Sequence, residues 1–379
     1  MCIMKAYKDY LDNEELNRNF IRIISKMTNS KRLNYIDNLR SLTVSLLIIY
    51  HLAMAYNTWG EPNYIFLGET KFFSAIVVLI SPWFMPLMFL LAGIGAFYSL
   101  KKRSFATFIK ERLIRLGIPF VFGMLIINPM LSFVADVTHN GYPGNILSHY
   151  GIYFTRFTDL SGYDGGFTLG HLWFVIVLIV ISILSSGIIK LCSRVKSNAF
   201  KFALNATLVV VAILAYNFKL LGKPLITYLC VFLLGYFLFS NQEFVNRLTK
   251  FKWLFTCLFI VSAITNTVLF VFVGKYELLN NICNYLAFAT GIPALFCLGN
   301  DYLNFTNSIC QKCSRLSYVF YIVHFPVVIL CQYYASLIGL GIIANFFVGV
   351  IAATVVTALL CLIIDTNPIT RVLFGLKSK

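Results

Sequence analysis

Arg40 and His51 are the two residues of this sequence whose chemistry and spacing fit each other best. They lie eleven positions apart in a largely apolar run, and in an α-helix eleven residues return to within about 20° of the same face while rising about 16 Å. A guanidinium group binds phosphates, and an imidazole accepts protons near neutral pH. The pair therefore predicts an anion-binding rim joined to a deeper site where His51 acts as general base or nucleophile. The alternative is a histidine that only packs between helices.

Six further residues are candidates to complete this site. Arg112 and Arg115 have i, i+3 spacing, which puts both guanidinium groups on one side of a helix, where they could clamp phosphates together with Arg40. Such pairs also serve as simple anchors at a helix start. The remaining candidates, for acceptor binding or for shaping the cavity, are Glu61, His171, Trp173 and His324. A structural hydrogen bond is the commoner role for either histidine, and an exposed loop carboxylate is the common role of a residue such as Glu61.

The composition identifies the environment that must position these side chains. Hydrophobic residues make up 59% of the chain and charged ones only 12%, with a mean hydropathy of +0.79, far from the usual balance of soluble proteins. Windows of roughly 18 or more apolar residues, long enough to cross about 30 Å of hydrocarbon, recur throughout. We expect an all-α polytopic membrane protein with about ten transmembrane helices, near residues 39–57, 72–99, 116–135, 171–192, 200–218, 223–240, 252–274, 280–299, 316–336 and 340–364.

The basic charge of the chain fits this topology better than it fits a nucleic-acid partner. The formal net charge is +16, which by itself could suggest phosphate binding. With ten spans and the N-terminus inside, however, the 31 Lys and Arg residues fall in cytoplasmic segments with five exceptions, Lys71, Arg156, Lys219, Lys223 and Lys275. This asymmetry is the one that the positive-inside rule requires. We therefore expect both termini in the cytoplasm and no nucleic-acid binding.

The chain divides into three segments. Residues 1–34 form a polar cytoplasmic arm without the apolar core of a secretory signal; Phe20, Ile21, Ile23 and Ile24 would let it lie on the inner leaflet as an amphipathic helix, or it is a loosely ordered arm. Residues 35–366 form a single membrane domain, and 367–379 a cytoplasmic tail. Within the domain, residues 136–170 predict a long extracytoplasmic loop, rich in Gly, Asp, Tyr and His, that covers a site for a polar acceptor or simply connects two spans.

Other kinds of site find little support. Most of the ten cysteines fall in or beside apolar spans, where cysteine packs as a small hydrophobe, so no disulfide framework is expected. Cys310 and Cys313 form an isolated C-x-x-C on a predicted loop, without a second pair at zinc-finger spacing. The sequence lacks the P-loop, H-E-x-x-H and G-x-S-x-G motifs. We expect neither a metal nor a permanently bound cofactor.

The geometry of Arg40 and His51 suits a long donor with an anionic head and a reactive tip, and acyl-CoA is such a donor. At these residues the sequence resembles the membrane-bound acyltransferase-3 family, and within it the branch named for glucans biosynthesis protein C. The matching segments span most of residues 33–365: 35–40 leading to His51, 90–93 followed by basic residues, Arg112 with Arg115, 170–174, and 317–326. One departure is Leu91-Ala92-Gly93, where many members carry Ser-Gly, so no role of that serine is carried over.

The resemblance implies an activity and a setting. It implies transfer of an acyl group, commonly acetyl or succinyl, from cytoplasmic acyl-CoA to a sugar hydroxyl on an extracytoplasmic polysaccharide, lipid-linked glycan or glucan. By position, Arg40 and His51 match the family's essential pair, and Arg112 and Arg115 match its paired arginines. We expect location in the plasma membrane, with acyl-CoA as co-substrate and with the carbohydrate acceptor, the lipid bilayer and proteins of envelope-glycan synthesis as partners. The alternatives are a glycan transporter or flippase, and a structural subunit of an envelope complex.

Overall fold

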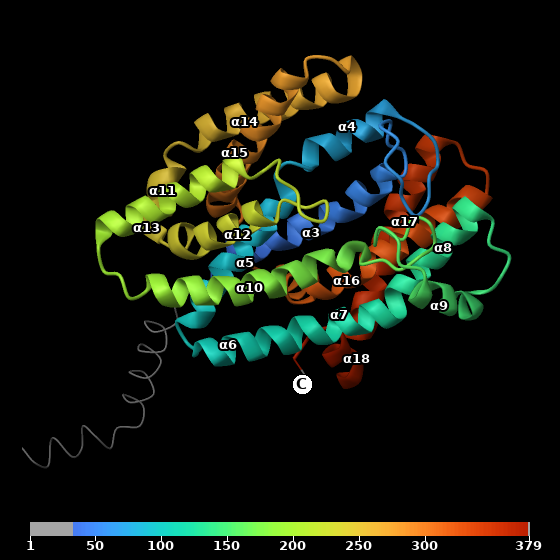
Figure 1. The fold of residues 1–379 in the computed structure, drawn as a ribbon, viewed down its shortest axis with the longest axis horizontal. Coiled ribbons are helices and arrows are strands. Elements are labelled where there is room, and N and C mark those ends of the chain that lie inside the picture. Colours follow the sequence, from blue (N-terminus) through green and yellow to red (C-terminus); the bar gives the residue numbers. More distant parts are fainter. Residues whose placement is uncertain (1–32, 378–379) are drawn as a thin grey trace, which may run out of the picture.

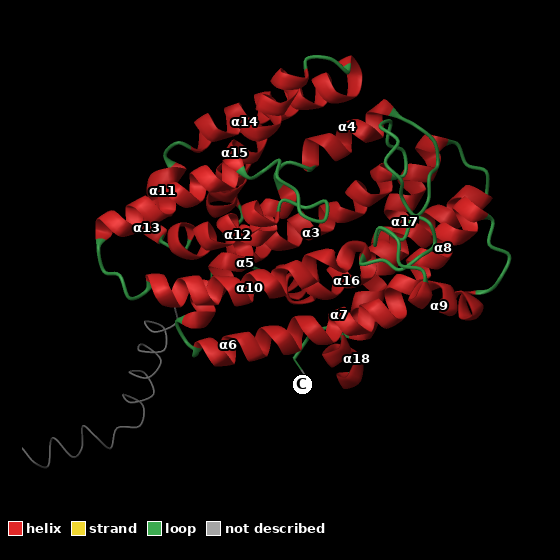
Figure 2. Cartoon of the chain, in the orientation of Figure 1, coloured by secondary structure: helices red, strands yellow, loops and turns green. Residues whose placement is uncertain are grey.

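The computed structural model describes residues 33–377, and helices are their only extended regular elements (Figures 1 and 2). The all-α expectation is therefore confirmed for this part of the chain. The amphipathic helix expected around Phe20 lies outside the described residues. The helices are α3 (Asn34–Met54), α4 (Lys71–Ile80), α5 (Phe84–Leu100), α6 (Phe105–Arg112), η1 (Leu113–Gly117), α7 (Ile118–Phe122), η2 (Gly123–Ile127), α8 (Asn128–Asn140), α9 (Ile146–Thr155), η3 (Gly170–Leu172), α10 (Trp173–Cys192), α11 (Asn198–Leu214), α12 (Leu225–Leu234), η4 (Gly235–Phe239), α13 (Gln242–Thr249), α14 (Lys252–Thr267), η5 (Val268–Val273), α15 (Glu277–Tyr302), α16 (Ser308–Leu337), α17 (Ile342–Ile364) and α18 (Pro368–Leu373).

Seven of the described helical stretches are long and apolar enough to cross a membrane. An eighth is added if the pair formed by Leu225–Phe239 and Gln242–Thr249, bent by 96°, is counted as one span. Each of the ten predicted windows coincides with a helical stretch. However, α3 and α11 are not among the helices that are long and apolar enough to cross a membrane. The chain is thus a polytopic membrane protein, and the predicted count of about ten is approximate.

Two of these stretches are irregular. A turn interrupts the helix between α4 and α5 at Pro82, because proline cannot supply an N–H to the helix. The stretch Phe105–Asn140 is continuous but contains the π-helical turns η1 and η2 on either side of α7.

Two predictions of loop structure are wrong. The segment 136–170 is not a loop throughout, because α8 continues to Asn140 and α9 follows, begun by the Asn145 side chain, which accepts a hydrogen bond from the Ser148 N–H at 3.0 Å. Cys310 and Cys313 lie in the first turns of α16 and not on a loop, since Asn307 caps that helix by accepting from the Cys310 N–H at 2.8 Å.

Helix α3 lies within the bundle and packs against α4, α5, α15, α16 and α17 (Figure 1). Its hydroxyl groups are satisfied inside the helix: Ser41, Thr43 and Ser45 each donate to the carbonyl four residues earlier, at 2.8–3.0 Å. Polar side chains can thereby lie in an apolar surrounding without a partner from another helix. We call the end where α3 begins the Arg40 end of the bundle, and the end where α3 finishes the His51 end.

Candidate active site

Helix α3 holds Arg40 and His51 as the sequence predicts, in one uninterrupted helix from Asn34 to Met54. Both side chains are half-buried. The His51 ring packs on Phe325 of α16, with 4.2 Å between ring centroids, and lies 5.4 Å from the ring of His324. His51 therefore faces the neighbouring helix at a point where another imidazole is presented to it.

Three predicted histidines meet at this point. His171, from the short helix η3, lies 5.4 Å from His324 and 5.3 Å from Phe325, measured between ring centroids. The rings of His171 and His324 are buried, with 4% and 0% of their surface exposed. His51, His171 and His324 thus form one cluster around Phe325, which we call the histidine cluster.

A proline in α16 explains how His171 is held. Pro326 has no N–H, so the carbonyl of Ile322 lacks its usual helical donor. The Nε2 atom of His171 donates to this carbonyl at 2.8 Å. In return, the Tyr321 hydroxyl donates to the carbonyl of His171. The proline that interrupts the hydrogen bonds of α16 therefore creates the acceptor that fixes η3 against it.

These bonds define which ring nitrogens remain available. His324 donates from Nδ1 to the Tyr321 carbonyl at 2.6 Å, so its Nε2 carries a lone pair, and that buried atom has no partner among residues 33–377. By the same reasoning, the Nδ1 atom of His171 is an unpartnered acceptor. Two free acceptor nitrogens thus lie in the cluster that contains half-buried His51, an arrangement able to accept and pass on a proton.

A cavity of about 650 Å³ opens at the Arg40 end. Arg40 and Arg115 both line it, as predicted for a phosphate-binding rim. Four further cations were not predicted for this site, and all of them come from segments late in the chain: Lys312, Arg315, Arg371 and Lys377. Arg112 does not line the cavity; its guanidinium lies 5.2 Å from the ring centroid of Phe108, within electrostatic range of Arg40 and Arg115.

Carboxylates neutralise part of this basic cavity. Asp365 accepts from Arg315 at 2.6 and 2.8 Å and from Arg371 at 2.6 Å, and it therefore ties α16, α17 and α18 together. Asp37 pairs with Arg40 at 3.3 Å on the first turns of α3. Within residues 33–377, Arg115 makes a single long hydrogen bond, from its Nε to the Gly375 carbonyl at 3.5 Å. Among the three predicted arginines, Arg115 is thus the one best placed to offer its guanidinium to an anion in the cavity.

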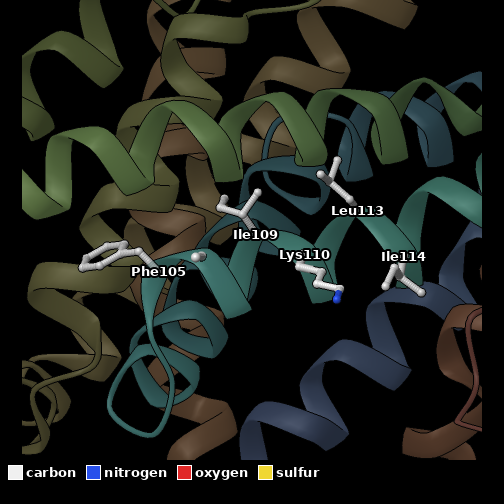
Figure 3. Close-up of a pocket in the computed structure, with 6 residues that line it drawn as sticks. Phe105, Ile109, Lys110, Leu113 and Ile114 are labelled. Atoms are coloured by element: carbon white, nitrogen blue, oxygen red, sulfur yellow. The ribbon is translucent and has the colours of Figure 1, made fainter.

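A second depression lies along α6 and η1, where Phe105, Ile109 and Leu113 line it together with Lys110 (Figure 3). These residues belong to a membrane-spanning stretch, and apart from Lys110 their side chains are apolar. The depression offers no convergent polar groups of the kind that small-molecule sites use. It therefore fits a lipid-facing surface better than a catalytic site.

Among the described residues, Trp173 and Glu61 make no ring contact or hydrogen bond with the three histidines of the histidine cluster. The Trp173 ring is stacked on Tyr228, with ring centroids 6.0 Å apart, and the Nζ of Lys223 lies 4.7 Å from its centroid. Glu61 accepts from the indole N–H of Trp59 at 2.9 Å and makes no hydrogen bond to His51. The Glu61 carboxylate is therefore held by Trp59 and does not orient His51.

Two extramembrane segments, residues 55–70 and 156–169, cover the His51 end. Tyr64 joins them, because its hydroxyl donates to the Ser161 carbonyl at 2.8 Å and lies 2.6 Å from the Thr168 hydroxyl. Its ring also packs on Phe325, at 5.5 Å between centroids. Asp136, buried beneath them, contacts Nε2 of His149 at 3.1 Å and Nη1 of Arg156 at 3.5 Å. The cover is thus anchored both to the helices and to the residue on which His51 packs.

The described residues contain no group of three or more His, Cys, Asp or Glu side chains arranged to hold a metal ion.

The family model Acyl_transf_3, described as an acyltransferase domain, matches residues 33–366. The chain belongs to the acyltransferase-3 family. No curated protein and no solved structure matches it. The enzyme is therefore an acyltransferase with several apolar membrane helices.

Sequence reasoning missed several residues of this acyltransferase. Tyr321 and Phe325 lie in the matched segment 317–326 but were not singled out, and only the fold reveals that they hold His171 and His51. Lys223 did carry a signal: it is one of the few basic residues outside the predicted cytoplasmic segments, in a turn between two apolar stretches. The cations of the basic cavity carry no such signal, because they are only a few of the 31 Lys and Arg residues of the sequence.

Proposed function

We propose that this acyltransferase moves an acyl group, acetyl or succinyl, from cytoplasmic acyl-CoA to a hydroxyl of an extracytoplasmic carbohydrate, a polysaccharide or a glucan as in the branch named for glucans biosynthesis protein C. The observation that carries the proposal is the arrangement along α3, with the basic cavity at Arg40 and the histidine cluster about 16 Å further along the helix. The asymmetry of Lys and Arg supports a cytoplasmic Arg40 end in the plasma membrane.

The basic cavity suits the donor's anionic head. Acyl-CoA carries several phosphates on its nucleotide and a thioester at the tip of a thin pantetheine arm. Arg40 and Arg115 would hold the phosphates by charge-assisted hydrogen bonds, helped by Lys312, while Arg112 adds positive potential from behind the cavity wall. The arm would then lie along α3 and bring the thioester to the histidine cluster.

At the cluster, His51 would act as general base. The acceptor hydroxyl attacks the thioester carbonyl, a new C–O ester bond forms, and the C–S bond breaks. The proton of the hydroxyl passes to His51 and from there to the departing CoA thiolate, so that protons and charge balance. In a two-step variant His51 attacks first and forms an acyl-imidazole, which the acceptor hydroxyl then cleaves.

The proposal is tested in membrane vesicles that contain the protein, with radiolabelled acetyl-CoA or succinyl-CoA as donor and extracted envelope glycans as acceptor. We expect label to enter the glycan fraction with the wild type and to be lost with His51→Ala at matched expression. His139→Ala, at an exposed histidine of α8, is the matched control and should keep its activity. Equal labelling by wild type and His51→Ala would refute the assignment of His51, and export of glycan without labelling would favour a transporter.

A further inference from the structure

The turn that joins α11 to α12 has an unusual backbone. Leu220 and Lys223 exchange two backbone hydrogen bonds, at 2.9 and 3.0 Å, and the two residues between them, Leu221 and Gly222, have φ values of +52° and +72°. This is the pattern of a tight two-residue hairpin turn that needs positive φ at both central positions. Glycine adopts it freely, but leucine does so at a cost, and such strain recurs where a side chain must be aimed.

The side chain that this turn presents is Lys223. Its ammonium lies 4.7 Å from the centroid of Trp173, at the start of α10, a distance at which a cation is attracted to the face of an aromatic ring. Trp173 is in turn stacked on Tyr228 of α12, with an interplanar angle of 24°. The ammonium group is therefore fixed from two sides, by the turn beneath it and by the aromatic pair beside it.

Lys223 has no salt bridge with any residue between 33 and 377, although it is half-buried. The Glu61 carboxylate is near enough to favour the charged form but is engaged by Trp59, and Lys219 opposes that form. Burial dominates and lowers the pKa of Lys223 below its ordinary value. A half-buried cation without a paired carboxylate is costly for the folded protein unless a ligand supplies the anion.

The position of Lys223 relates it to the proposed reaction. Its ammonium lies within electrostatic range of the His51 ring, although the two residues come from different parts of the bundle. It is at the His51 end, opposite the basic cavity that would take the donor's phosphates. An anion held by Lys223 would therefore belong to the second substrate.

We propose that Lys223 binds an anionic group, a carboxylate or a phosphate, on the carbohydrate acceptor and thereby positions the acceptor's hydroxyl at His51. Trp173 is then a positioning residue: it holds the Lys223 ammonium. In this proposal Lys223, and not Trp173, makes the contact with the acceptor that the sequence predicts for Trp173. This inference rests on the proposed function and narrows the acceptor to charged glycans.

The test uses membrane vesicles with radiolabelled acetyl-CoA and the host's own extracted envelope glycans as acceptor, fractionated by anion exchange before and after reaction. We expect the label in anionic glycans, whose masses distinguish a carboxylate from a phosphate. Lys223→Met should raise the KM for the acceptor at least tenfold and leave the KM for acetyl-CoA unchanged, while Lys223→Arg restores most of the affinity. Lys275→Met, at an exposed lysine that is not among the charges acting on Lys223, is the matched control and should behave as the wild type.

Each outcome decides a different point. Label found only in neutral glycans, or an unchanged acceptor KM in Lys223→Met, overturns the inference while leaving the acyltransferase proposal intact. A rise in both KM values together indicates general damage to the fold and also overturns it, because the predicted effect is confined to the acceptor. No labelling of glycans by the wild type with either acetyl-CoA or succinyl-CoA as donor overturns the proposed function itself.

Discussion

The imidazole of His51 on α3 lies 5.4 Å, between ring centroids, from the imidazole of His324 on α16, at an interplanar angle of 38°. His324 is fully buried and its Nε2 atom has no partner among the described residues, whereas His51 is half-buried. A buried polar atom left without a partner is costly and often marks a functional site. The relationship therefore suggests that His324 assists His51 in handling the proton of the reaction.

The first prediction concerns His324. His324→Phe keeps an aromatic ring for the stack on Phe320 but removes the free Nε2 acceptor. We expect kcat to fall by about a hundredfold, the usual scale of general acid–base assistance, with the KM for acyl-CoA unchanged. Steady-state kinetics with His139→Phe as control measures this. An unchanged kcat would restrict His324 to packing.

The second prediction concerns the basic cavity. Arg115→Ala removes a guanidinium that lines the cavity and makes one long hydrogen bond among the described residues. We therefore expect the KM for acyl-CoA to rise by about tenfold to a hundredfold with little change in kcat. Arg194→Ala, at an exposed arginine after α10, should change neither parameter. An effect on kcat alone would mean that Arg115 does not bind the donor.

The third prediction concerns the carbonyl that Pro326 leaves free. His171→Phe removes the donor to the Ile322 carbonyl, and we expect this to cost about 2 kcal/mol of stability, the scale for a buried acceptor left unsatisfied. In a Pro326→Ala background the new N–H of residue 326 can bond that carbonyl, so the same change should cost much less. Thermal unfolding of the four proteins in detergent measures the coupling. Additive effects would show that the proline does not create the site for His171.

The fourth prediction is the pH dependence of acceptor binding. Burial lowers the pKa of Lys223 below its ordinary value of 10.5, so its charge is lost at a lower pH than that of a surface lysine. The protonated form binds the anion, and acceptor binding should therefore weaken as the pH rises through this lowered pKa, while the KM for acyl-CoA stays level. In Lys223→Arg the guanidinium keeps its charge, so the profile should be flat. If acceptor binding by Lys223→Arg weakens with rising pH in the same way as that of the wild type, Lys223 is not the group that binds the acceptor's anion.

The sequence by itself determined the features that depend on local chemistry. Apolar windows predict the helical stretches, because a chain that crosses a bilayer must satisfy its own backbone hydrogen bonds and a helix does so. The shared face of Arg40 and His51 follows from helical geometry alone. The break at Pro82 is likewise local, since it requires only a missing N–H.

Only the tertiary structure decided which distant residues meet. Hydropathy is nearly the same on many faces of these helices and does not encode their partners, so nothing local brings His171 to His324 or the Lys223 turn to Trp173. The same holds for Arg112, whose spacing predicts a place in the basic cavity but whose guanidinium lies over Phe108. The packing of α3, η3 and α16 therefore brings residues scattered along the chain into one histidine cluster.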